Sequence, residues 1–175
     1  MNYRLPEISD EMLLRKYATE HYDHGETRIS ASLGLADSDY RNWVEKIRTN
    51  ASVGNEKWGK SLLYLCFDGT KLIGLLSIRY ELPKALSEKY GDIGYGVRPT
   101  ERKKGYATAM LQYGLSVCRE KGMEQAILGC YKDNPASAAT IKRNGGVLIA
   151  ENDNYVEGRI SQYYLIKLSK EPSGL

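Results

Sequence analysis

A short basic segment between a predicted strand and a predicted helix is well suited to bind an anion. It reads Val97-Arg98-Pro99-Thr100-Glu101-Arg102-Lys103-Lys104-Gly105-Tyr106-Ala107. The run 91–97 predicts a strand, and Pro99 ends it because proline cannot donate to a sheet ladder. Gly105 opens the next helix, where free N–H groups and the helix dipole favour negative charge. Since Gly105 has no side chain, a ligand can approach the backbone closely.

A second phosphate motif stands earlier in the chain. Gly54 to Ser61 spells Gly-x-x-x-x-Gly-Lys-Ser, which matches the Walker A pattern. That pattern binds phosphate when a strand precedes it and a helix follows it. Here a polar helix end precedes it, and the apolar run 62–67 predicts a strand after it. We therefore interpret Lys60 and Ser61 as the start of a strand.

Neither metal binding nor disulfide formation is supported by the residue pattern. His21 and His24 are spaced i, i+3 without a third ligand nearby, which favours helix packing. The three cysteines, Cys66, Cys118 and Cys130, lie in apolar runs without CxxC spacing. Such cysteines are typical of small buried residues in a reduced protein. We expect no metal site.

Length and composition indicate one globular domain. The chain has 175 residues, 42% hydrophobic and 27% charged, which excludes disordered and collagen-like classes. The net charge of +3 is too small to indicate a nucleic-acid binder. The N-terminus has no apolar signal region, and no stretch approaches the ~20 apolar residues that span a bilayer. We therefore expect a cytoplasmic protein.

Hydrophobic spacing predicts an α/β (α+β) domain over residues 1–175. Helices are expected from Ser9 to about residue 21, at 40–47 after a cap at Asp37 or Ser38, at 105–121 and at 134–144. Strands are expected at 61–67, 71–80, 91–97, 125–131, 146–151 and 159–168, with connections at 31–35, 49–60, 83–90 and 152–158. This order predicts a mixed, mostly antiparallel sheet of about six or seven strands, flanked by helices on both faces.

The motif Val97-x-Pro99-x-x-Arg102-x-x-Gly105-x-Ala107 resembles the acetyl-CoA signature of the GNAT superfamily of N-acetyltransferases. A second block, Asn134-Pro135-Ala136-Ser137, begins 27 residues after Ala107 and resembles the family's Asn-x-x-Ser/Ala element. The element order resembles the family over nearly the whole chain, and the motifs cover about 91–146. Among family members, the chain is similar to uncharacterised bacterial acetyltransferases with an Ile-Gly-Tyr-x-Val-Arg-Pro strand.

The resemblance implies acetyl-CoA as cosubstrate and no metal. The amides of 102–107 would hold the pyrophosphate, with basic side chains adding charge there or at the ribose phosphate. Strand 95–97 would face the pantetheine, and an N–H near Val97 would polarise the thioester carbonyl. The implied cofactor-binding residues are Tyr95, Gly96, Val97, Arg102, Lys103, Lys104, Gly105, Tyr106, Ala107, Asn134 and Ser137.

The implied chemistry is direct attack of a neutral amine on the thioester within a ternary complex. Many family members place an acidic Tyr seven residues after the Asn, but this chain has Ile141 there, so that role does not carry over. The candidate acids are instead Tyr131, Tyr163 and Tyr164. The candidate bases, at the ends of predicted strands, are Asp92 and Glu81.

Three functions remain to be compared. The first is an N-acetyltransferase acting on a small-molecule or protein amine, and the second is a non-catalytic acyl-CoA-binding regulatory module. The third, a nucleic-acid binder, is disfavoured because the basic cluster is short and lacks spaced aromatic residues. We expect no nucleic-acid or membrane partner, and a homodimer as a candidate assembly. Segment 98–105 alone carries the +3 of the whole chain, which favours a phosphate-rich cofactor.

Overall fold

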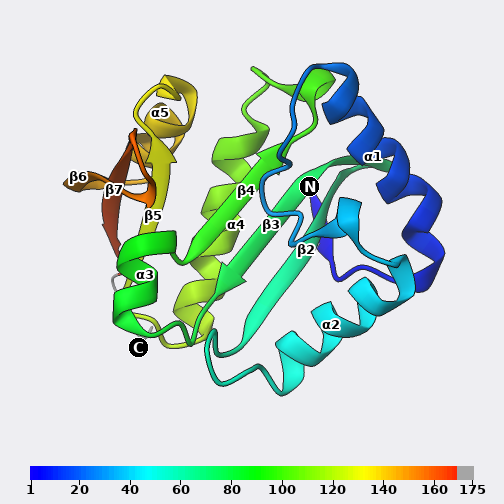
Figure 1. The fold of residues 1–175 in the computed structure, drawn as a ribbon, viewed down its shortest axis with the longest axis horizontal. Coiled ribbons are helices and arrows are strands. Elements are labelled where there is room, and N and C mark those ends of the chain that lie inside the picture. The colour runs from blue at the N-terminus through cyan, green and yellow to red at the C-terminus, as the bar shows by residue number, and fades with distance from the viewer. Residues whose placement is uncertain (169–175) are drawn as a thin grey trace, which may run out of the picture.

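The computed structural model describes residues 1–168, which form helices and strands in mixed order (Figure 1). The strands are β1 (Asn2–Arg4), β2 (Ser61–Asp68), β3 (Lys71–Arg79), β4 (Ile93–Val97), β5 (Gln125–Tyr131), β6 (Val147–Val156) and β7 (Arg159–Lys167). The α-helices are α1 (Glu11–Asp23), α2 (Tyr40–Ser52), α3 (Lys84–Tyr90), α4 (Tyr106–Glu120) and α5 (Pro135–Arg143). This order confirms the predicted fold class.

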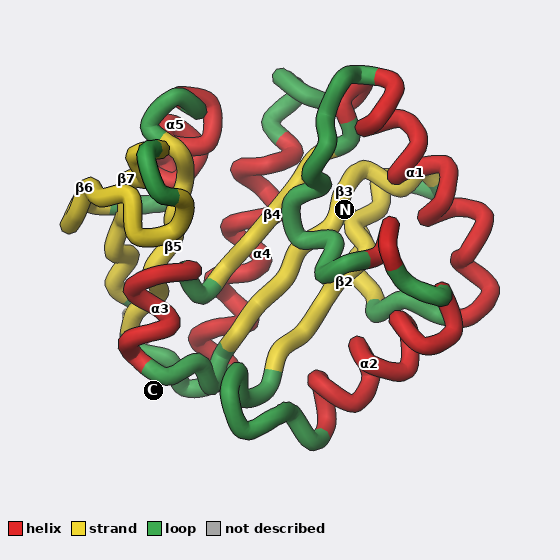
Figure 2. The backbone as a smooth tube through the Cα atoms, in the orientation of Figure 1, coloured by secondary structure: helices red, strands yellow, loops and turns green. Residues whose placement is uncertain are grey.

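The strands form two sheets rather than one. The first has the order β1-β2-β3-β4 and the second β5-β7-β6, with every strand pair antiparallel (Figure 2). The sheets meet at the start of β4, where the Asp92 N–H donates to the Ile127 carbonyl over 2.6 Å. Beyond that point β4 and β5 separate, and α5 lies at the open end (Figure 1).

Two apolar cores lie on opposite faces of the first sheet. α1 and α2 cover one face, where Leu14 and Trp43 pack with Leu75 of β3. α4 covers the other face, where Met110 packs with Leu76. The neighbours Leu75 and Leu76 point to opposite faces because side chains alternate along a strand. Each such buried side chain contributes about 1.5–3 kcal/mol, and helices flank both faces of the sheet, as predicted.

Two elements were missed by the sequence analysis. β1 pairs with β2, and Arg4 secures it through an ion pair with Asp10 at 2.6 Å. A three-residue strand is too short to show a period, so no pattern predicts it. α3 occupies the expected polar connection 83–90, and Ser87 is its only buried residue. Without an apolar stripe, a seven-residue helix has no periodic signal.

Several predicted boundaries were also wrong. α1 begins after Asp10, and Ser9 lies within the preceding 3-10 turn instead of capping the helix. The cap of α2 is Asp39, which accepts the Asn42 N–H over 3.0 Å, whereas Asp37 and Ser38 were expected. α2 runs on to Ser52, four residues into the predicted loop 49–60. β6 extends through most of the predicted turn 152–158, because an irregular ladder with β7 continues there.

The context of the Walker-like segment agrees with its interpretation as a strand start. α2 precedes it and β2 follows it, and Gly54 and Gly59 lie at the two ends of a tight turn closed by an Asn55–Gly59 bridge. Lys60 forms an ion pair with Glu81 at 3.4 Å. The segment therefore lacks the strand–loop–helix arrangement of a P-loop.

Histidines and cysteines occupy the ordinary positions predicted for them. His21 Nδ1 lies 2.7 Å from the Glu26 carboxylate, and the ring of His24 bonds its own helix. Cys66 and Cys118 are buried, Cys130 is partly buried, and all three are free. Residues 1–168 contain no group of three His, Cys, Asp or Glu side chains able to hold a metal. Within the same range no helix has the length and apolar character needed to cross a membrane.

Candidate active site

The N-terminus of α4 presents backbone amides to open space. Gly105 is its N-cap with φ of +83°, and the first bond of the helix ladder runs from the Ala109 N–H to the Gly105 carbonyl. The amides of residues 106–108 precede that ladder and have no helical acceptor. A Cβ built on Gly105 would meet nothing within 4 Å. A glycine in the left-handed region thus leaves the amides accessible to an anion.

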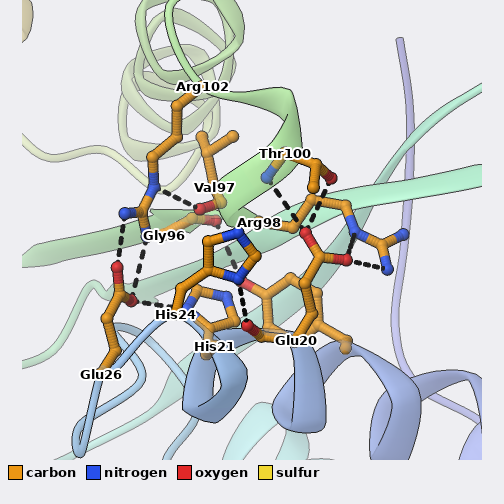
Figure 3. A network of polar contacts seen from close by, with 10 residues as sticks. Glu20, His21, His24, Glu26, Gly96, Val97, Arg98, Thr100 and Arg102 are labelled. Atoms are coloured by element: carbon orange, nitrogen blue, oxygen red, sulfur yellow. Dashed lines mark hydrogen bonds and ion pairs between the residues drawn. The ribbon is translucent and has the colours of Figure 1, made fainter.

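One side of the basic loop is fastened to α1 (Figure 3). The Glu20 carboxylate accepts hydrogen bonds from Arg98 Nε at 2.8 Å and from the Thr100 hydroxyl at 2.7 Å. Although partial burial raises the pKa of Glu20, the bonds from Thr100 and Arg98 lower it to about 2. The Arg98 charge is therefore neutralised by the protein itself.

Arg102 is held in the same way. Its guanidinium pairs with Glu26, from the segment after α1, and its Nε donates to the Val97 carbonyl over 3.1 Å. Hydrogen bonds from Arg102 hold the pKa of Glu26 below its ordinary value. The sequence prediction that this side chain adds charge around a pyrophosphate gains no support from this placement. The side chain instead joins the end of β4 to the segment after α1.

The other side of the loop is fastened to the β2–β3 hairpin. Glu101 is only 5% exposed, and its carboxylate pairs with Lys104 at 2.8 Å and with Lys71 at the start of β3. The Tyr106 hydroxyl donates to Asp68 over 2.6 Å. Among residues 1–168, Lys103 is the one cation of the segment 98–105 without an ion pair.

A hydrogen bond crosses from β4 to α5 where β4 and β5 separate. The Tyr95 hydroxyl lies 2.9 Å from Ser137 Oγ. Asn134 caps α5 by accepting the Ser137 N–H over 3.1 Å, as predicted. The residues expected to contact pantetheine thus lie together, beside the start of α5. Ile141, at the position of the family's Tyr, is fully buried in the core.

The opposite face of β4 is lined by glycine and covered by the segment after α1. A Cβ on Gly96 would lie 2.9 Å from the Ser30 carbonyl oxygen, and one on Gly94 would lie 4.0 Å from the Ala31 side chain. The Tyr17 hydroxyl of α1 donates to the Gly96 carbonyl over 3.3 Å. The two glycines therefore let this segment approach the strand closely.

The structure separates the two candidate bases. Asp92 is 5% exposed at the start of β4, where its carboxylate accepts the Ile127 N–H over 2.7 Å, and burial raises its pKa. Glu81 is exposed beyond the end of β3, paired with Lys60. Asp92 therefore lies buried at the junction of β4 and β5, whereas Glu81 is an exposed residue of the loop that follows β3.

The candidate acids differ in their surroundings. Tyr131 ends β5, with its ring 6.0 Å from that of Tyr155 and beneath the Arg159 guanidinium. The Tyr163 hydroxyl donates to the Lys89 carbonyl over 2.9 Å. Tyr164 is fully buried and donates to Gln162 over 2.8 Å. Of the three, Tyr131 lies at the end of β5 where that strand has separated from β4.

The structure thus brings together an open helix N-terminus, two separating strands and a second helix capped by asparagine. The sequence profile described as "Acetyltransferase (GNAT) family" matches residues 17–146. The chain belongs to this family, and its donor is acetyl-CoA. The family assignment confirms the resemblance seen in the sequence and the prediction of an acetyltransferase.

Solved structures of low sequence identity share the fold. yncA from Salmonella typhimurium, solved with its cofactor acetyl-CoA, has a TM-score of 0.70 at 14% identity, covering 98% of this chain and 96% of that one. A mutant of the spermidine N-acetyltransferase SpeG from Vibrio cholerae has a TM-score of 0.67 at 14% identity, covering 96% and 95%. A ribosomal-protein-alanine N-acetyltransferase from Brucella melitensis has a TM-score of 0.69 at 14% identity, covering 96% and 100%. A search of curated protein sequences found no match.

Proposed function

We propose that the protein transfers the acetyl group of acetyl-CoA to a primary amine by direct attack within a ternary complex. The observation that supports this most strongly is the open N-terminus of α4, where Gly105 leaves the amides of the first turn accessible. The two faces of β4 support it further. Tyr95 and its hydrogen bond to Ser137 lie on one face. The other face, near Asp92, is lined by glycine.

In this proposal the backbone carries most of the donor binding. The amides of residues 102–107 hold the pyrophosphate, and Lys103 supplies the free charge nearby. Arg102 and Lys104 contribute through their amides, because their side chains are already paired with Glu26 and Glu101. Residues 95–97 and the start of α5 position the pantetheine arm.

The proton transfers are assigned to Asp92 and Tyr131. A carboxylate whose pKa is raised by burial holds a proton more readily near neutral pH, which suits a base that accepts one from the attacking amine. Tyr131 then protonates the departing thiolate from the end of β5. Glu81 is the less favoured base, since it is exposed and already pairs with Lys60. A homodimer stays a prediction.

The test is turnover of acetyl-CoA with a panel of primary amines, followed as CoA release and as the mass of the N-acetylated product. Amine-dependent CoA release supports the proposal, and Asp92→Asn is expected to lower kcat by about 10²–10⁴-fold with little change in CoA affinity. Heat stabilisation by acetyl-CoA without release with any amine would favour the alternative, a non-catalytic acyl-CoA-binding regulatory module.

A further inference from the structure

A half-buried arginine at the end of β3 forms no ion pair within residues 1–168. Arg79 ends β3, and its Nε is buried without a hydrogen-bond partner among residues 1–168. Within the same residues, its one side-chain hydrogen bond runs from Nη2 to the Tyr90 carbonyl over 3.4 Å. No carboxylate oxygen in the described part of the chain lies within 4.0 Å of this guanidinium. Buried charges in proteins are normally paired.

The register of the sheet places Arg79 on the glycine-lined face of β4. Ser77 lies opposite Gly94, and the Arg79 N–H donates to the Asp92 carbonyl over 2.8 Å. Side chains alternate along a strand, so those of Arg79 and Ser77 share one face. A Cβ on Gly94 would lie 4.0 Å from Arg79 Nη2 and 4.0 Å from the Ala31 Cβ. The guanidinium thus lies next to Gly94, one residue before the segment 95–97 proposed to position the pantetheine arm.

Aromatic rings continue from this position toward the end of β5. The ring of Tyr90 lies 5.1 Å from Trp58 and 5.8 Å from Tyr155, and Tyr155 lies 6.0 Å from Tyr131, centre to centre. Tyr155 is 39% exposed. These rings offer apolar surface to an organic ligand, and Arg79 donates to the Tyr90 carbonyl at one end of the row, whereas Lys57, Lys89 and Arg159 each lie over one of the rings.

We propose that Arg79 binds the carboxylate of the acceptor, so that the acceptor is an amine that also carries a carboxylate, such as an amino acid. This rests on the proposed acetyl transfer and names the substrate class for it. A guanidinium presents parallel N–H donors that match a carboxylate. Asp92 lies close enough to Arg79 to act on its charge, which disfavours a phosphate dianion more than a single carboxylate.

The experiment compares L-α-amino acids with the matching amino acid amides, and includes O-phosphoethanolamine and spermidine as amines without a carboxylate. Acetylation is measured for the unmodified protein, Arg79→Met, Arg79→Lys and the control Arg48→Met, an exposed arginine of α2. In a second measurement, the same acids and amides are added with CoA, and the melting temperature is recorded without any turnover.

At least one amino acid should exceed its amide in kcat/KM by tenfold or more, on the order of the discrimination expected for a lost charged hydrogen bond. Arg79→Met should abolish that ratio, mainly through KM, and Arg48→Met should retain it. In the presence of CoA, the acid should raise the melting temperature more than the amide does.

Three results would overturn the inference while acetyl transfer stands. They are equal rates for acids and amides, a preference for spermidine or O-phosphoethanolamine, and an acid-to-amide ratio of kcat/KM that is unchanged in Arg79→Met. Absence of turnover with every amine would instead refute the proposed function. The melting measurement then still decides the inference, since equal stabilisation by acid and amide contradicts a carboxylate site. It also decides the case in which neither Arg79 variant folds.

Discussion

The basic side chains of the loop 98–105 have different roles. Arg98, Arg102 and Lys104 are each held by a carboxylate of the protein, so they shape the loop. Lys103 is exposed, has φ of +62° and forms no ion pair within residues 1–168. The sequence groups Lys103 and Lys104 as equivalent cations, and the structure distinguishes them.

Lys103→Ala should therefore weaken CoA binding more than Lys104→Ala does. A free exposed cation near a phosphate contributes about 0.3–1 kcal/mol, or roughly two- to five-fold in affinity. Calorimetric titration with CoA and with dephospho-CoA measures both variants. If Lys103 reaches the ribose phosphate, its loss affects CoA alone. Equal affinities for the two variants would contradict this division of roles.

At the scale of elements, α1 and the segment that follows it are attached to the loop after β4 by one carboxylate each. Glu20 holds Arg98 and Thr100, and Glu26 holds Arg102 (Figure 3). The pKa of Glu20 is lowered to about 2, so its ionised form stabilises the folded protein. That contribution is complete above the ordinary glutamate pKa of about 4.3 and is lost as pH falls toward 2.

Glu20→Gln should melt at a lower temperature than the unmodified protein at pH 7. The difference between the two should shrink as pH falls from about 4.3 to about 2, because both side chains are then uncharged. Thermal melts across that range measure it. Glu45→Gln, at an exposed position of α2, serves as the control and should show no such trend. A difference in melting temperature between Glu20→Gln and the unmodified protein that stays constant with pH would refute the stabilising role of ionised Glu20.

Elements with a strong period or cap could be predicted from the sequence, and short or irregular ones could not. α4, β5 and α5 lie where the apolar spacing, Asn134 and the glycines placed them. β1 and α3 depend on contacts with distant segments. Glu20 and Glu26 were missed for the same reason, since their partners are about 76–80 residues away in sequence.

The chain has fourteen tyrosines and one phenylalanine, and several of the tyrosine hydroxyls connect elements of the fold. Tyr17 donates to the Gly96 carbonyl, Tyr40 to that of Glu7 and Tyr163 to that of Lys89. Each hydroxyl joins two elements that are distant in sequence, which phenylalanine could not do. These three rings are buried, so their hydroxyls bond within the core and not at the surface.

For the whole molecule, the net charge of +3 does not correspond to three free cations in the basic loop of the folded protein. Three of the four cations in segment 98–105 are neutralised by Glu20, Glu26 and Glu101, so the loop presents amides and one free lysine to a ligand. The sequence analysis expected side-chain charge to attract the ligand, whereas most of that charge is paired within the folded protein. Ion pairing between distant segments is invisible in a single sequence. Arg79 was missed because nothing in its local sequence distinguishes it from a surface arginine.

The central claim is that the open N-terminus of α4 holds acetyl-CoA, and Gly105→Glu tests it most directly. Gly122, at the other end of α4, has φ of +79° and equally open surroundings, so Gly122→Glu carries the same backbone strain of about 1–2 kcal/mol. Acetyl-CoA affinity is measured for both by calorimetry. We predict similar melting temperatures for the two variants, unchanged affinity in Gly122→Glu and loss of binding in Gly105→Glu. Unchanged affinity in Gly105→Glu would contradict the account.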